Sequence, residues 1–190
     1  MMDGTDPNGA AGPGDSPGDP LPFARLLAMR PLLEEIGDLK RVRQDGCSLA
    51  EANFAASWGA LIAGESPDFI ALREVVKAVS GVVLGPVDTN RLADLGLSRA
   101  DIAGVLREAM IQRAPALGET LAARLSRGVE IAAIPEAVPE DMPSFVGRLS
   151  DTPRAGATFP GKARLVLEPA ENHAEHCWTV AVYAALMVLL

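Results

Sequence analysis

Helix start signals recur along this 190-residue chain and constrain its fold more than any other feature. Ser48 stands three residues before Glu51, which is the spacing of a capping box, and Ser98 stands at the same distance before Asp101. Asp88 is suited to cap a third helix in the same way. Such punctuation predicts a series of short helices rather than strands.

Glycines and prolines supply the matching stop signals. We expect Gly64 and Gly128 to end two of the helices, because glycine is favoured just past a helix C-terminus, and Gly81 to lie near the end of a third. Pro31 is expected to break the first apolar stretch, so that a helix starts at this residue. Pro115 is expected to separate two later helices.

The composition agrees with a helical fold. Hydrophobic residues make up 48% of the chain but aromatic residues only 4%, a bias toward helix formers over strand formers. We therefore predict an all-α fold, a single irregular helical domain of about seven helices with a Pro/Gly-rich connecting segment. Four regions are expected: a disordered acidic leader at 1–20, a helical domain at 21–128, a Pro/Gly-rich linker with one short helix at 129–170, and an apolar C-terminal helix at 171–190.

Charge and cysteine usage exclude several classes of function. The net charge of -8 argues against nucleic-acid binding, and the basic run KRVRQ at 40–44 is too small to reverse this. Two distant cysteines indicate a reducing compartment, so we expect a cytoplasmic protein. The 14 uncharged residues from Cys177 to Leu190 are fewer than the roughly 20 that span a bilayer, which disfavours a membrane anchor.

One apparent phosphate-binding motif is rejected. The stretch GATFPGKA at 156–163 fits the spacing of a phosphate-binding loop, but Ala163 follows the lysine where such loops need Ser or Thr to hold magnesium. Polar residues precede it in place of a buried strand, so we interpret the stretch as a connecting loop.

Both histidines of the chain lie at the start of the C-terminal helix. His173 and His176 are three residues apart and therefore share one helix face. Asn172 and Glu175 have the order of a capping box, which explains part of this stretch without any chemistry. From Cys177 onward the helix is apolar all round, which predicts a central, buried position.

The stretch HCWTVAVYA at 176–184 resembles the first metal-ligand helix of the HD-domain metal-dependent phosphohydrolases. That family is all-helical. The resemblance covers about seventeen residues and implies that His176 is the first ligand of a divalent metal ion, which would activate water for attack on a phosphoryl group. The family's later His-Asp dipeptide does not occur in this sequence. The chain would then be the N-terminal part of such an enzyme, truncated and inactive alone.

Two other hypotheses follow from the same helix. The chain could be a non-enzymatic helical interaction or regulatory domain, in which the C-terminal helix packs into a groove formed by the other helices. A helical protein partner, or a missing C-terminal part, would cover residues 177–190. A tail-anchored protein is the third and weakest hypothesis. The sequence identifies no nucleophilic catalytic residue.

Overall fold

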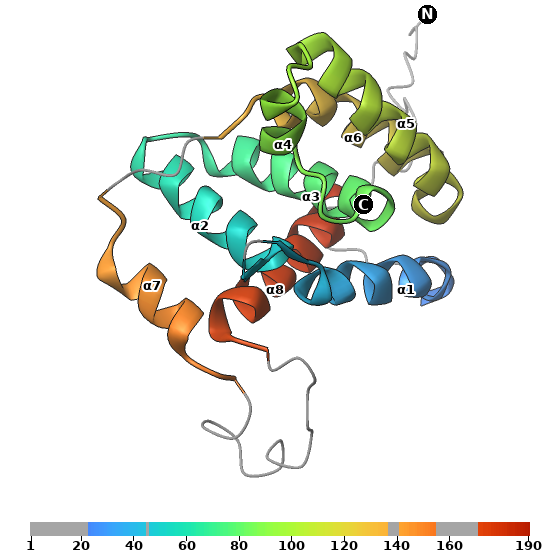
Figure 1. Cartoon of the computed structure of the whole chain (residues 1–190). Helices are drawn as coiled ribbons and strands as arrows, with labels where there is room; N and C mark the ends of the chain where they lie inside the picture. The colour runs from blue at the N-terminus through green and yellow to red at the C-terminus, as the bar shows by residue number, and fades with distance from the viewer. Residues whose placement is uncertain (1–22, 45, 137–140, 155–170) are drawn as a thin grey trace, which may run out of the picture.

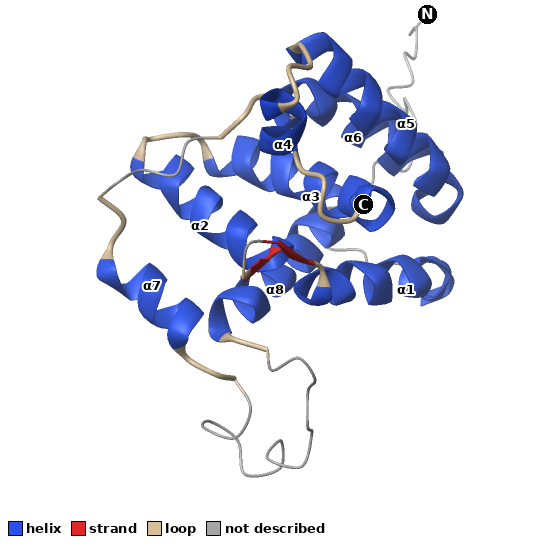
Figure 2. Ribbon diagram, in the orientation of Figure 1, coloured by secondary structure: helices blue, strands red, loops and turns tan. Residues whose placement is uncertain are grey.

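The computed structural model describes residues 23–44, 46–136, 141–154 and 171–190, and this part of the chain is all-α. Its eight α-helices are α1 (Phe23–Gly37), α2 (Leu49–Ile62), α3 (Pro67–Leu84), α4 (Thr89–Asp94), α5 (Arg99–Leu117), α6 (Glu119–Ala132), α7 (Ser144–Asp151) and α8 (His173–Leu189). A short 3-10 helix, η1 (Asp38–Arg41), follows α1. The strands β1 (Arg43–Gln44) and β2 (Cys47–Ser48) form one small antiparallel ladder (Figure 2).

Helix α3 is the centre of the fold. It contacts α5 and α6 on one side and α1, α2 and α8 on the other (Figure 1). Helix α7 packs against α2 and α8. The buried residues form one continuous hydrophobic core, to which every helix contributes. The predicted all-α class is confirmed, with one helix more than expected from the sequence.

The predicted helix starts are confirmed where a side chain can cap the helix. Ser48, Asp88, Ser98 and Asn172 each accept a hydrogen bond from the backbone N–H three residues later. Ser98 and Asn172 form complete capping boxes. These starts depend on contacts within one helical turn, which is why the sequence alone predicts them.

The predictions that two prolines break helices were wrong. Pro31 lies inside α1 and Pro115 inside α5. In α1, Met29 lies two residues before Pro31 and Leu32 directly after it, and both are almost fully buried. Core packing therefore holds the helix together despite the lost backbone hydrogen bond. Helix α5 ends instead at Gly118, where φ is +75°.

One of the glycine stops predicted from the sequence was also wrong. Gly64 follows α2 with φ at +83°, and Gly81 lies in the last turn of α3, as predicted, but Gly128 lies inside α6. A Cβ atom on Gly128 would lie 2.7 Å from Cγ of Leu72, so this glycine lets α6 approach α3 closely. Tertiary packing, not helix termination, explains Gly128.

Some predictions fall on residues outside the described part. The acidic leader at 1–20 and the rejected phosphate-loop stretch at 156–163 both lie there. The single short helix expected within 129–170 is α7. Among the described helices, none is both long and apolar enough to cross a membrane.

Candidate functional site

Helix α8 is two-sided, contrary to the expectation that it is buried all round. Its inner face carries Trp178, Val182 and Leu186, all buried against the other helices. Its outer face is apolar and yet exposed to solvent; we call it the α8 strip, and it consists of Cys177, Val180, Ala181, Ala184 and Val188. Cys177 is therefore exposed rather than a small buried hydrophobe. An uncharged exposed helix face is a feature that marks interaction sites.

A groove lies beside this strip, between α2, α3 and α8. Its volume is about 360 Å³, at the lower end of the range for ligand pockets. The lining is almost entirely apolar. Buried side chains make the floor and more exposed ones the rim, among them Phe54, Ile70, Trp178, Val182, Leu61 and Ala181. The groove can therefore take apolar groups of another molecule without rearrangement of the core.

The floor of the groove is fixed by one polar contact. Nε1 of Trp178 donates a 2.8 Å hydrogen bond to Oε2 of Glu74, and both residues are buried. Glu74 is the one charged residue among those that line the groove. Because the indole N–H has a charged acceptor, the Trp178 ring is held in one orientation.

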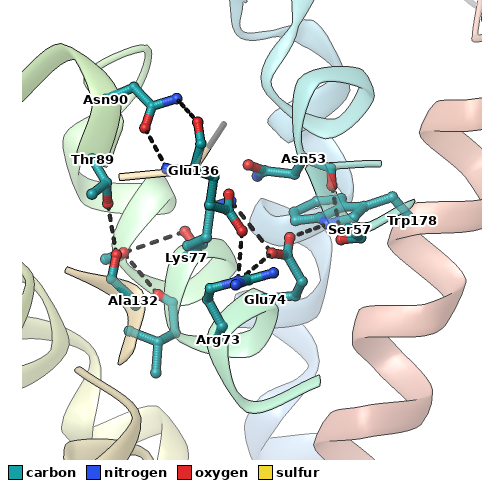
Figure 3. A network of polar contacts seen from close by, with 12 residues as sticks. Asn53, Ser57, Arg73, Glu74, Lys77, Thr89, Asn90, Ala132, Glu136 and Trp178 are labelled. Atoms are coloured by element: carbon teal, nitrogen blue, oxygen red, sulfur yellow. Dashed lines mark hydrogen bonds and ion pairs between the residues drawn. The ribbon is translucent and has the colours of Figure 1, made fainter. Parts of the chain in front are cut away.

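Glu74 belongs to a buried ionic cluster, which we define as Arg73, Glu74, Lys77 and Glu136 (Figure 3). Nε of Arg73 lies 3.5 Å from Glu74 and 2.6 Å from Glu136. Nζ of Lys77 lies 3.3 Å from Glu74 and is also paired with Glu136. Two cations thus alternate with two carboxylates, and each charge has partners of opposite sign.

The environment of Lys77 keeps this residue charged. Burial alone would lower the pKa of Lys77, but the neighbouring carboxylates of Glu74 and Glu136 outweigh it and raise the pKa above its usual value. Glu136 is itself held in place by its backbone, which exchanges two hydrogen bonds of 2.9 and 3.0 Å with the side chain of Asn90 (Figure 3). The cluster therefore joins α3 to the segment that follows α6.

His176, the predicted metal ligand, lies in a different place. Its side chain is partly exposed in the first turn of α8, with Nδ1 3.9 Å from Oε1 of Glu171. Glu171 is only 3% exposed and accepts hydrogen bonds from Arg154 at 2.8 Å and Lys40 at 3.3 Å. Burial alone would raise the pKa of Glu171, but Arg154 and Lys40 lower it below its usual value.

The described residues around His176 do not form a complete metal site. In the part of the chain that the structure describes, no group of three or more His, Cys, Asp or Glu side chains could hold a metal ion. Glu171, whose carboxylate lies 3.9 Å from Nδ1 of His176, is already paired with two cations. Nδ1 of His173 lies 3.2 Å from the backbone carbonyl of Thr152. A metal role for His176 stays a prediction that these surroundings do not support.

Sequence reasoning missed the ionic cluster and the ion pairs that the basic run forms. Arg73 and Lys77, four residues apart on one helix face within an apolar segment, were a signal for buried ion pairs. The basic run at 40–44 supplies Lys40 to Glu171, and its Arg43 lies 3.6 Å from Glu175. Its positive charges are thus used within the protein.

Comparison of the chain with protein-family models, with curated proteins and with solved structures found no match. Function is therefore inferred from the geometry of the groove and its surroundings.

Proposed function

We propose that this chain is a non-enzymatic helical interaction domain whose groove binds the apolar side chains of a helix from another protein. The observation that carries the proposal is the open apolar groove that lies directly beside the exposed α8 strip. Helix-in-groove recognition uses this combination, in which one face of an amphipathic helix supplies anchors spaced three and four residues apart.

The α8 strip and the groove form one continuous surface. Cys177 and Ala181 belong to both, and Ala184 and Val188 extend the strip along the same helix face. Most of these side chains are small, so a partner helix can approach α8 closely while its larger side chains enter the groove. Val188, which is 83% exposed, would be covered by such a partner.

Fixed aromatic side chains shape the groove. Trp178 is fixed by Glu74, and the ring of Trp58 packs edge-on against Phe54 and against Phe145, with centroid distances of 6.4 and 4.9 Å. A rigid aromatic lining lowers the entropy cost of binding, because few side chains must be ordered when the partner docks.

Blocking the groove tests the proposal. The probe is a fluorescent synthetic peptide of roughly 18 residues, with leucines on one helix face and glutamines on the other. We expect Ala181→Phe to weaken binding at least about tenfold, because the new ring fills the mouth of the groove. The matched control is Ala123→Phe on α6, another exposed helical alanine, which should leave binding unchanged. Equal binding by both variants, or no binding by the wild-type protein, would overturn the proposal.

The relation to metal-dependent phosphohydrolases is a second candidate that the resemblance of residues 176–184 alone supports. It predicts that the purified chain binds a divalent metal ion and that His176→Ala lowers the bound amount. Metal content by mass spectrometry decides the matter, since equal content in the two proteins removes the ligand role of His176.

A further inference from the structure

We infer that the helix bound by this groove is positively charged, with Lys or Arg near the end that lies over the turn between α2 and α3. This inference rests on the proposed function and adds the chemistry of the partner. It follows from the distribution of charge around the groove.

The three helices that line the groove expose no Lys or Arg side chain. Helices α2 and α8 contain neither Lys nor Arg. Helix α3 contains Arg73 and Lys77, whose side chains are only 5% and 9% exposed and are used in the ionic cluster. No positive side chain of these helices is therefore available to a partner at the surface.

Two exposed acidic residues, in contrast, lie next to one end of the groove lining in the sequence. Glu65 is two residues before and Asp68 directly after Pro67, which lines the groove at the turn between α2 and α3. Oε2 of Glu65 is 2.8 Å from Nη1 of Arg73, so this carboxylate faces the edge of the ionic cluster. Two cations, Arg73 and Lys77, then face three carboxylates, which leaves one negative charge unbalanced, and Asp68 adds a second.

This excess negative charge favours a positively charged partner over an acidic one. A cationic residue that follows the apolar anchors of a partner helix would meet Glu65 and Asp68 at the rim, and the net charge of -8 would attract it over a longer range. A second copy of this chain would instead bring another acidic turn and another α8 without cations. The charge pattern therefore favours a basic partner over self-association.

Three peptides that share the same leucine face test the inference. Their polar faces carry lysine, glutamine or glutamate, and binding is followed by fluorescence anisotropy at low and high salt. We expect the lysine peptide to bind the wild-type protein about five- to tenfold more tightly than the glutamine peptide at low salt, and the glutamate peptide to bind most weakly. High salt should reduce these differences.

Two double variants locate the charge effect. Glu65→Gln with Asp68→Asn should remove most of the preference for lysine and leave the affinity of the glutamine peptide unchanged. Glu108→Gln with Glu119→Gln, on exposed positions of α5 and α6, changes the net charge by the same amount and should keep the preference. An equal loss in both variants would show a general effect of net charge and overturn the inference.

The remaining outcomes separate the inference from the proposed function. If the lysine and glutamine peptides bind equally well, the inference is wrong while the groove still binds a helix. If no peptide binds, the proposed function itself fails. If sedimentation shows that the wild-type chain is a dimer that Ala181→Phe dissociates, the groove is occupied by a second copy and the inference is overturned.

Discussion

Removal of Glu74 is the most direct perturbation of the groove floor. Glu74→Ala deletes the acceptor of the Trp178 indole N–H and one of the three carboxylates that pair with the buried cations Arg73 and Lys77. Glu136 would still pair with both cations, and Glu65, at the surface, with Arg73 alone. Removal of one partner of a buried ion pair typically costs about 3–5 kcal/mol of unfolding free energy, and we expect the lower end of this range because two carboxylates remain.

Two milder substitutions separate the contributions. Glu74→Gln keeps an oxygen acceptor for the indole but loses the negative charge, and Trp178→Phe keeps the aromatic ring but loses the donor. Each is expected to cost about 1–3 kcal/mol, as usual for a buried polar group that loses a charged partner. Because the two residues are in direct contact, the double variant should be less destabilised than the sum of the single variants, by about 0.5 kcal/mol or more.

Urea unfolding at pH 7.5, followed by circular dichroism, measures all of these values. Glu108→Ala serves as the control, because this glutamate is exposed on α5 and its loss should change the unfolding free energy by less than about 0.5 kcal/mol. A cost below about 1 kcal/mol for Glu74→Ala, or strict additivity of Glu74→Gln and Trp178→Phe, would refute the described role of Glu74.

Three further predictions concern other parts of the fold. Gly128→Ala should destabilise the protein by about 1–3 kcal/mol because its Cβ meets a packed side chain, whereas Gly104→Ala, with open space around it, should stabilise α5 by about 0.5–1 kcal/mol. Urea unfolding of both variants measures these changes, and equal effects would contradict the prediction. Burial and the neighbouring Glu51 raise the pKa of the Cys47 thiol to about 12, so at pH 8 only about one molecule in ten thousand carries the thiolate at this residue. A thiol reagent should therefore label the exposed Cys177 first. A Cys177→Ser variant that reacts as fast as the wild-type protein would contradict this. Arg154 and Lys40 lower the pKa of Glu171 in the folded protein. The ionised carboxylate therefore stabilises the fold above the usual glutamate pKa, and this stabilisation is lost as the pH falls through the lower pKa of the folded state. Glu171→Gln should be less stable than wild type at pH 7, and the difference in acid unfolding should shrink below about pH 4.

The sequence predicted helix starts best where contacts within one helical turn determine them. Ser48, Asp88, Ser98 and Asn172 cap helices through hydrogen bonds that span one turn, and all four were recognisable from spacing alone. The helix breaks predicted at Pro31, Pro115 and Gly128 were wrong because packing between helices overrides such signals. Gly128, for example, is explained only by its contact with α3.

The candidate site could not be predicted for the same reason. Lys77 and Glu136 meet across 59 positions of sequence, and Trp178 meets Glu74 across 104. The groove is a property of three helices and leaves no spacing pattern in any one of them. The histidine of the resemblance was placed correctly on the first turn of a helix, but its buried neighbour Glu171 and the two cations around it were not anticipated.

The ionic cluster also has a consequence for how this protein can evolve. Loss of one member removes one opposite charge from its buried partners, and a cost of about 3–5 kcal/mol is a large share of the 5–15 kcal/mol that stabilises a typical domain. Joint replacement of the whole cluster by apolar residues of similar volume, by contrast, is often neutral or stabilising. Single substitutions within the cluster are therefore disfavoured, because a stepwise path to an apolar interior passes through poorly folded intermediates. This applies to Arg73, Glu74, Lys77 and Glu136 alike. Relatives of this protein should keep all four charges or none of them.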